Sequence, residues 1–86
     1  MSYYFYLLRC KDGSLYSGVT TDLKNRELLH NSGKGSKYVR SRGGGKIIYS
    51  ERFIKIAKAL ARERAVKKWP KPRKEQLVLA KPSRPR

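Results

Sequence analysis

The chain has 86 residues, enough for one domain with a modest core, and its 22 lysines and arginines against 6 acidic residues give a net charge of +16. This excess goes beyond what solubility requires and predicts an anionic partner, with nucleic acid favoured over a membrane surface. The composition excludes an intrachain disulfide and a multi-cysteine zinc site because Cys10 is the only cysteine, and no apolar run approaches the roughly 20 residues of a membrane span.

The first segment with a clear pattern is a β-hairpin. The aromatic and aliphatic run YYFYLLRC (3–10) favours a strand, KDGS (11–14) a turn, and LYSGV (15–19) the returning strand. A two-residue turn would place Tyr6 and Tyr16 on opposite faces of the hairpin. A three-residue loop with Gly13 at positive φ pairs Tyr6 with Gly18 and brings both tyrosines to one face. We predict the second register, with both hydroxyls opening into one cleft.

A helix is predicted next, from Asp22 to Asn31, with Thr21 or Asp22 as its N-cap. At about 100° per residue, Arg26 and His30 fall on the face that should turn toward the sheet. Glu27 falls toward solvent. An inward arginine next to a histidine is unusual for a purely structural helix and marks a candidate site.

The remainder of the chain predicts one more strand and two helices. Residues 31–45 are rich in glycine, serine and basic residues and predict a mobile basic loop. KIIYS (46–50) favours a strand, residues 53–69 a helix stopped by Pro70, and RKEQLVLA (73–80) a short helix. The order β-β-α-β-α predicts an α/β fold in which helices flank a small three-stranded antiparallel sheet. One domain is expected over residues 1–80, with a disordered basic tail at 81–86.

Glu63 is the acidic residue that the helical pattern predicts to be buried. It projects into the middle of an apolar stripe formed by Phe53, Ile56, Ala59, Leu60 and Val66. A buried carboxylate needs a cation. Arg26 would give a structural ion pair, whereas a metal ion would suit a lone carboxylate that shares Mg²⁺ with substrate phosphate and water. The residues themselves leave both possibilities open.

These features together resemble the GIY-YIG nuclease superfamily. The resemblance is carried by the triplets YFY (4–6) and YSG (16–18), followed by Arg26, His30 and Glu63. More closely, the chain resembles the small stand-alone bacterial members over residues 3 to about 80, with YLLRCKDGSLYSGVTTDL and HNSGKGSKY in the expected order. It departs from many members in having no asparagine beyond Glu63, and only Glu75 or Gln76 lie near that position.

The resemblance implies a DNA endonuclease that depends on a divalent metal, Mg²⁺ or Mn²⁺, and acts in repair or recombination. Tyr6 or Tyr16, with Tyr16 favoured, would activate water, and Arg26 would bind the scissile phosphate. His30 would assist the nucleophile or the phosphate, and Glu63 would hold the metal. By the same resemblance, a glycine at position 18 would let substrate or metal approach the strand closely.

The basic residues of the loop are candidates for binding the nucleic-acid backbone: Lys34, Lys37, Arg40 and Arg42. Phosphate contacts carry affinity but little sequence information, so cleavage should be structure-selective or weakly sequence-specific, unless a protein partner supplies specificity. The rival hypothesis is a non-catalytic basic module that binds nucleic acid and retains the nuclease fold. A lone cysteine suits the reducing cytoplasm, where we expect the protein to act.

Overall fold

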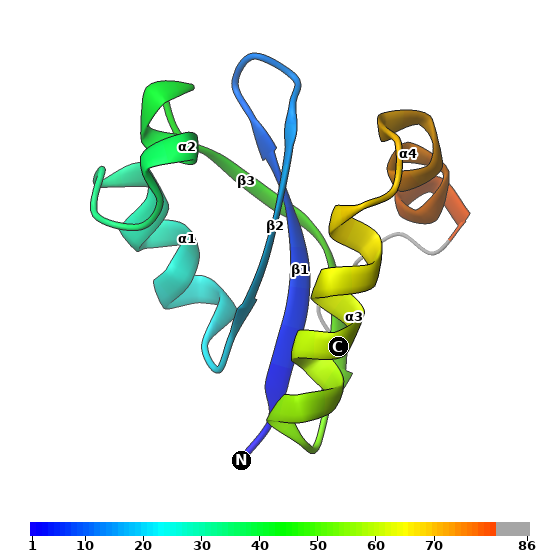
Figure 1. Cartoon of the computed structure of the whole chain (residues 1–86). Helices are drawn as coiled ribbons and strands as arrows, with labels where there is room; N and C mark the ends of the chain where they lie inside the picture. Colours follow the sequence, from blue (N-terminus) through cyan, green and yellow to red (C-terminus); the bar gives the residue numbers. More distant parts are fainter. Residues whose placement is uncertain (81–86) are drawn as a thin grey trace.

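The computed structural model describes residues 1–80, so the predicted tail at 81–86 lies outside the described residues (Figure 1). Within residues 1–80, three strands and four helices follow one another. Their bounds are β1 Tyr3–Cys10, β2 Leu15–Thr20, α1 Leu23–Asn31, α2 Lys37–Ser41, β3 Gly45–Phe53, α3 Ile56–Lys67 and α4 Lys71–Ala80. No helix within residues 1–80 has the length and apolar character needed to cross a membrane.

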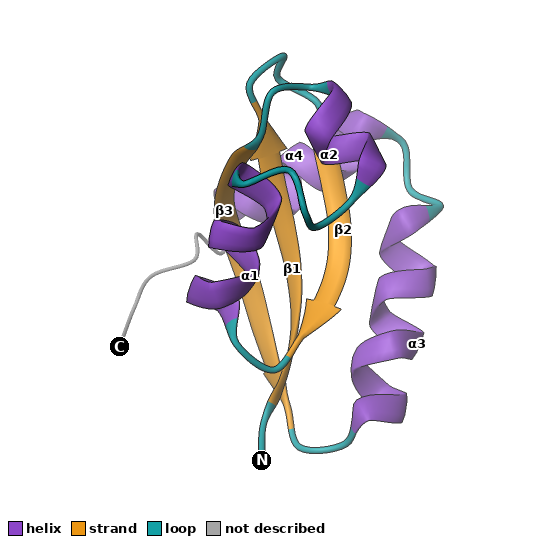
Figure 2. Cartoon of the chain, turned by 90° about the vertical axis from the view of Figure 1, so that its left-hand side faces the viewer, coloured by secondary structure: helices purple, strands orange, loops and turns teal. Residues whose placement is uncertain are grey.

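The strands form one antiparallel sheet in the order β2-β1-β3, which confirms the predicted fold class. Helices α1 and α2 cover one face, α4 lies on the other side, and α3 packs along the edge strand β2 and against β1 (Figures 1 and 2). The central strand β1 is therefore covered on both faces. This explains why its sequence is a continuous apolar run rather than an alternating one.

The hairpin has the predicted three-residue loop. Gly13 has φ of +90°, and its N–H donates to the Cys10 carbonyl at 2.9 Å. Tyr6 consequently pairs with Gly18, and Leu8 pairs with Tyr16. The register that brings the two tyrosines to the same face is confirmed.

Two small cores lie on the two faces of β1. On the side of α3 and α4, the buried residues are Phe5, Leu7, Tyr49 and Val66. On the side of α1 and α2, they are Tyr6, Leu8, Cys10 and Val39. The alternation of side chains along β1 thus separates a structural core from the face that carries Tyr6.

The segment predicted to be a mobile loop contains the short helix α2. The Ser36 hydroxyl accepts from the Tyr38 N–H at 3.0 Å and caps this helix, and Val39 anchors it in the core. Gly43 and Gly44, at φ of +81° and +87°, then turn the chain into β3. The prediction of an unstructured loop was wrong because one cap and one buried side chain suffice to order five residues.

Three other expectations needed correction. Strand β3 runs on to Phe53, so α3 begins at Ile56 rather than at residue 53. Helix α4 begins earlier than predicted, at Lys71. Glu27 is not directed only toward solvent. Its carboxylate accepts a hydrogen bond from the Ile47 N–H at 2.6 Å and thereby satisfies a backbone donor of the edge strand β3.

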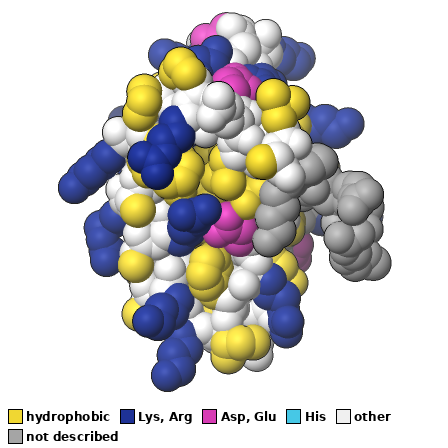
Figure 3. Space-filling view, turned by 90° about the vertical axis from the view of Figure 1, so that its right-hand side faces the viewer, with side chains coloured by type: hydrophobic (Ala, Val, Ile, Leu, Met, Phe, Trp, Pro, Cys, Tyr) yellow, Lys and Arg dark blue, Asp and Glu magenta, His cyan; other side chains and the backbone are white. Residues whose placement is uncertain are grey.

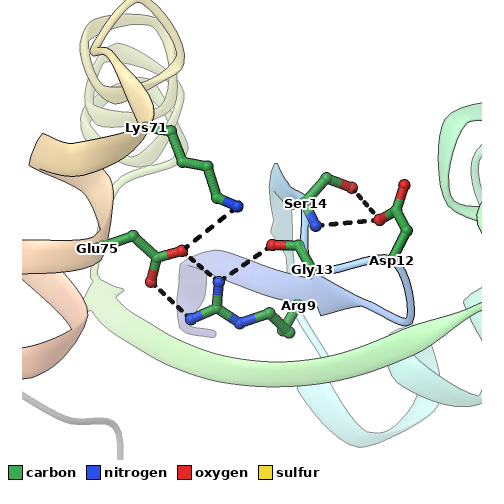
Figure 4. Close-up of polar contacts among 6 residues, drawn as sticks. All are labelled: Arg9, Asp12, Gly13, Ser14, Lys71 and Glu75. Carbon is green, nitrogen blue, oxygen red and sulfur yellow. Dashed lines mark hydrogen bonds and ion pairs between the residues drawn. The ribbon is translucent and has the colours of Figure 1, made fainter.

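An ion pair fastens α4 to the sheet. The Arg9 guanidinium donates to both carboxylate oxygens of Glu75, with Nη2 at 2.6 Å from Oε1, and also to the Gly13 carbonyl at 3.2 Å (Figure 4). Lys71 lies 3.9 Å from the same carboxylate. The hydrogen bond from Arg9 lowers the pKa of Glu75 below its usual value.

We expect Arg9→Met to lower the free energy of unfolding by about 0.5–1 kcal/mol near neutral pH, since the pair is partly exposed. A depressed carboxyl pKa stabilises the fold above the unfolded value, about 4.3, and this contribution disappears as the pH falls through the folded value. Urea denaturation at about pH 7 and about pH 3 should show the difference shrinking in acid. The control Lys71→Met should lower the free energy of unfolding by less than Arg9→Met does. A difference independent of pH would instead indicate lost packing of the Arg9 stem.

Candidate active site

A buried hydrogen bond between Tyr6 and His30 lies at the centre of the candidate site. The Tyr6 hydroxyl on β1 and His30 Nε2 on α1 are 2.8 Å apart, and the two residues are 1% and 2% exposed. Burial raises the pKa of Tyr6, and the neighbouring Tyr16 and Glu63 add to this effect while Arg26 opposes it. Burial and Arg26 both lower the pKa of His30. The bond therefore joins a neutral phenol to a neutral imidazole near neutral pH.

Tyr16 places a second tyrosine ring against this pair. Its ring centroid is 6.4 Å from that of Tyr6 and 5.3 Å from that of His30. Tyr16 is half-buried, and its hydroxyl forms no hydrogen bond with any other of residues 1–80. The expectation that both hydroxyls open into one cleft was wrong for Tyr6, whose side chain is buried with its hydroxyl bonded to His30. Tyr16 is the tyrosine whose hydroxyl remains available.

Arg26 and Glu63 bring opposite charges to the site from two helices. Both are half-buried, and both act electrostatically on Tyr6. Neither side chain forms a hydrogen bond or an ion pair within the described part of the chain, so the structural Arg26–Glu63 pair considered from the sequence is not formed. Glu63 is near enough to act electrostatically on Tyr6 because α3 packs against β2 and β1.

The apolar stripe predicted around Glu63 is only partly present. Ala59 and Val66 are buried, but Ile56 and Leu60 are 49% and 36% exposed. Glu63 is consequently half-buried at the border of the helix's inner face rather than enclosed at its centre. A carboxylate in this position keeps access to water and to a ligand.

Two glycines allow the Tyr6–His30 pair to form. A Cβ atom on Gly18 would overlap the Tyr6 hydroxyl, and a Cβ atom on Gly35 would overlap His30 Nδ1. The absent side chain at Gly18 thus makes room for the Tyr6 ring, which corrects the expectation that this space serves substrate or metal. The role of Gly35 was missed from the sequence, where it is one of several glycines in the basic segment 31–45.

We expect Gly35→Ala to displace the His30 ring and to destabilise the fold by about 1–3 kcal/mol through overpacking. The pKa of His30, lowered by burial, should then rise toward its ordinary value as the ring becomes hydrated. NMR titration of the histidine ring and thermal unfolding would measure both effects. Lys34→Ala, at an exposed neighbouring position, is the matched control. An unchanged His30 pKa would show that the loop does not hold the ring.

Three of the four predicted phosphate-binding residues are exposed and form no ion pair within residues 1–80: Lys34, Lys37 and Arg40. Arg42 differs, because its guanidinium lies 3.3 Å from the Asp12 carboxylate and 3.8 Å from the centroid of the Tyr38 ring. The Tyr38 ring in turn lies 5.8 Å from that of Tyr16. Arg42 therefore packs against the ring of Tyr38, which lies next to Tyr16, whereas the other three cations face solvent.

The donor set at Glu63 suits a hard divalent cation. Within residues 1–80 no group of three or more histidine, cysteine, aspartate or glutamate side chains could hold a metal. Glu75, which lies near the position where the resemblance leads us to expect an asparagine, is bound to Arg9 instead. A single half-buried carboxylate without an internal partner fits Mg²⁺ or Mn²⁺, which take their remaining ligands from water and substrate phosphate. It does not fit a structural zinc ion.

Comparisons with known proteins point to one family. A family model described as "GIY-YIG catalytic domain" matches residues 2–76. A "UPF0213 protein" of Streptococcus pneumoniae is 44% identical over 75 residues, covering 87% of this chain and 76% of that protein. Another, of Bacillus pumilus, is 45% identical over 77 residues, covering 90% and 79%. The solution NMR structure of a UPF0213 protein from Bacillus halodurans matches with a TM-score of 0.61 at 44% identity, covering 94% and 86%.

Proposed function

The chain belongs to the GIY-YIG nuclease family, and we propose that it is a metal-dependent endonuclease that hydrolyses phosphodiester bonds in DNA. One observation carries the proposal: Arg26 and Glu63 lie beside the Tyr6–His30 pair and remain unpaired within residues 1–80. In a site without a catalytic role, an ion pair between the two side chains would neutralise both charges. Left apart, they are available to a phosphate and to a cation.

Each side chain has a role in this proposal that its surroundings support. Arg26 binds the scissile phosphate and stabilises the charge that develops on it. Tyr16, whose hydroxyl has no internal partner, orients the attacking water and, in its phenolate form, accepts the proton that the water loses. His30 fixes the hydroxyl of Tyr6, so that the Tyr6 ring supports that of Tyr16.

Glu63 would hold the divalent ion, Mg²⁺ or Mn²⁺. When bound, such an ion neutralises charge on phosphate oxygens during hydrolysis. The position of Glu63 beside Tyr6 supports this assignment, as does the absence of any hydrogen bond or ion pair to its carboxylate within residues 1–80.

DNA affinity would come from Lys34, Lys37 and Arg40 on the side of α1 and α2. Contacts of this kind bind the backbone without identifying bases. The nuclease would therefore select DNA structure, or cleave with weak sequence preference, unless a protein partner directs it. These properties suit a cytoplasmic enzyme of DNA repair or recombination.

Nicking of supercoiled plasmid and of branched DNA tests the proposal. The purified protein should produce nicked or cut products with Mg²⁺ or Mn²⁺ and none with excess chelator. Salt-sensitive binding is expected of a nuclease and of a non-catalytic module alike, so binding cannot separate them. Tight binding without products under any of these conditions would favour the non-catalytic module.

A further inference from the structure

A strongly basic surface on the outside of α3 has no role in the proposed active site. We call it the α3 outer face and define it by four exposed cations and three exposed alanines: Lys58, Arg64, Lys67, Lys68, Ala57, Ala61 and Ala65. At about 100° per residue, Arg64 and Lys68 point away from the buried Ala59 and Val66. Figure 3 shows lysine and arginine side chains spread among hydrophobic ones on the side that carries α3 and α4.

The charges of the α3 outer face are not neutralised by the described part of the chain. None of the four cationic side chains forms an ion pair or hydrogen bond with another of residues 1–80. Between positions 54 and 74 the sequence has a single acidic residue, Glu63, which lies toward Tyr6 on the inner side. Neighbouring like charges repel one another, so this surface is more stable with an anionic ligand on it.

The helix dipole accounts for only part of this charge distribution. A cation stabilises the C-terminal end of a helix, which could explain Arg64, Lys67 and the C-cap residue Lys68, but not Lys58 in the first turn. The N-cap residue is Lys55, and its side chain makes no capping hydrogen bond. The first turn therefore presents uncapped N–H groups beside two lysines. An oxyanion would stabilise this end of α3, where the chain itself supplies no acidic group.

The alanines indicate what kind of anion fits. Small side chains at Ala57, Ala61 and Ala65 let the helix backbone approach a partner closely, while the long cations beside them reach to either side. A nucleic-acid backbone offers such a row of charges. Ile56 and Leu60, which would attract an acidic amphipathic peptide, lie at one border of the face rather than at its centre.

We propose that the α3 outer face is a second nucleic-acid-binding surface, so that one molecule holds two duplex segments at once. The first segment would lie on the side of α1 and α2, and the second against α3, which faces another direction (Figures 1 and 2). The described part of the protein measures only 30 × 29 × 24 Å. One duplex, with a persistence length of about 150 base pairs, does not bend sharply enough to follow both surfaces without a large cost.

A bridging assay with chelator present tests this inference independently of cleavage. A duplex attached to beads captures a fluorescent second duplex only if one protein unit binds both. Two triple variants remove equal charge from exposed positions: Lys58→Gln, Arg64→Gln, Lys68→Gln on α3, and Lys34→Gln, Lys37→Gln, Arg40→Gln on the first surface. Each should abolish bridging, yet keep binding one duplex. The salt dependence of wild-type binding (log K against log salt) should flatten by up to about 3 in each.

Thermal melting should confirm that both variants stay folded, and sedimentation that the wild type is monomeric at the concentrations used. Bridging by the α3 variant at the wild-type level would overturn the proposal, as would a wild type that captures no second duplex. Binding of a poly-glutamate peptide that depends on the α3 cations, with duplex bridging unchanged, would assign the face to acidic proteins instead. Failure of DNA nicking would leave these results unaffected.

Discussion

Glu63→Gln should reduce the rate of DNA cleavage in Mg²⁺ by about three orders of magnitude or more while leaving DNA affinity nearly unchanged. The substitution keeps the size of the side chain but removes the charge that would hold the ion. Bound metal contributes several kcal/mol to phosphoryl chemistry, and about 4 kcal/mol corresponds to a thousandfold in rate. No phosphate contact is lost, so binding should persist. Single-turnover nicking and fluorescence anisotropy would measure the two quantities separately.

Glu75→Gln is the matched control for this substitution. Glu75 is also a glutamate on a helix, but its carboxylate is bound to Arg9 where α4 meets the sheet. The control should lower stability slightly and cleave at the wild-type rate. Wild-type cleavage by Glu63→Gln would show that the Glu63 carboxylate has no part in the reaction.

Tyr16→Phe should lower the single-turnover rate by about 10²–10⁴-fold, the usual contribution of a positioned acid or base. The Tyr16 hydroxyl forms no hydrogen bond within residues 1–80, so its removal should barely change stability. Tyr6→Phe should behave in the opposite way. It breaks a buried hydrogen bond and leaves His30 unsatisfied, with a cost of about 1–3 kcal/mol in the free energy of unfolding.

The comparison therefore requires both rate and stability for each variant. A larger loss of rate in Tyr6→Phe than in Tyr16→Phe, measured well below the melting temperature, would assign the water-activating role to Tyr6. Equal losses with no change in stability would contradict the separation of roles that the two environments suggest.

Features encoded in neighbouring residues could be predicted from the sequence. Gly13 determined the loop of the hairpin, and with it the register that places Tyr6 and Tyr16 on one face. Helical periodicity placed His30 and Arg26 on the inner face of α1. The spacing of these residues, together with Glu63, also led to the family that the comparisons confirm.

Features created by contacts between distant segments could not be predicted in this way. The contact of Gly35 with His30 depends on how the chain after α1 folds back, and the bond from Ile47 to Glu27 depends on where β3 meets α1. Arg42 looked like another phosphate ligand, yet Asp12 from the hairpin turn pairs with it. The residue pattern of one helix or strand does not show which residue of another helix or strand will contact a given side chain.

The exposure of α3 was mispredicted for a similar reason. An apolar stripe indicates that one side of a helix is buried, but not how wide the covering surface is. Helix α3 lies along the edge of a sheet of only three strands, so Ala59 and Val66 are covered while Ile56 and Leu60 remain at the border. The same narrow contact leaves Glu63 accessible.

The proposed reaction depends most on whether Glu63 holds a divalent cation near Tyr6 and Tyr16, and paramagnetic broadening by Mn²⁺ in NMR spectra of the isotope-labelled protein measures this directly. Low concentrations of Mn²⁺ should selectively broaden the signals of these three residues. The signals of Glu75 should stay sharp, and Glu63→Gln should abolish the effect. Broadening centred on Glu75, or broadening that persists unchanged in Glu63→Gln, would contradict a metal site at Glu63.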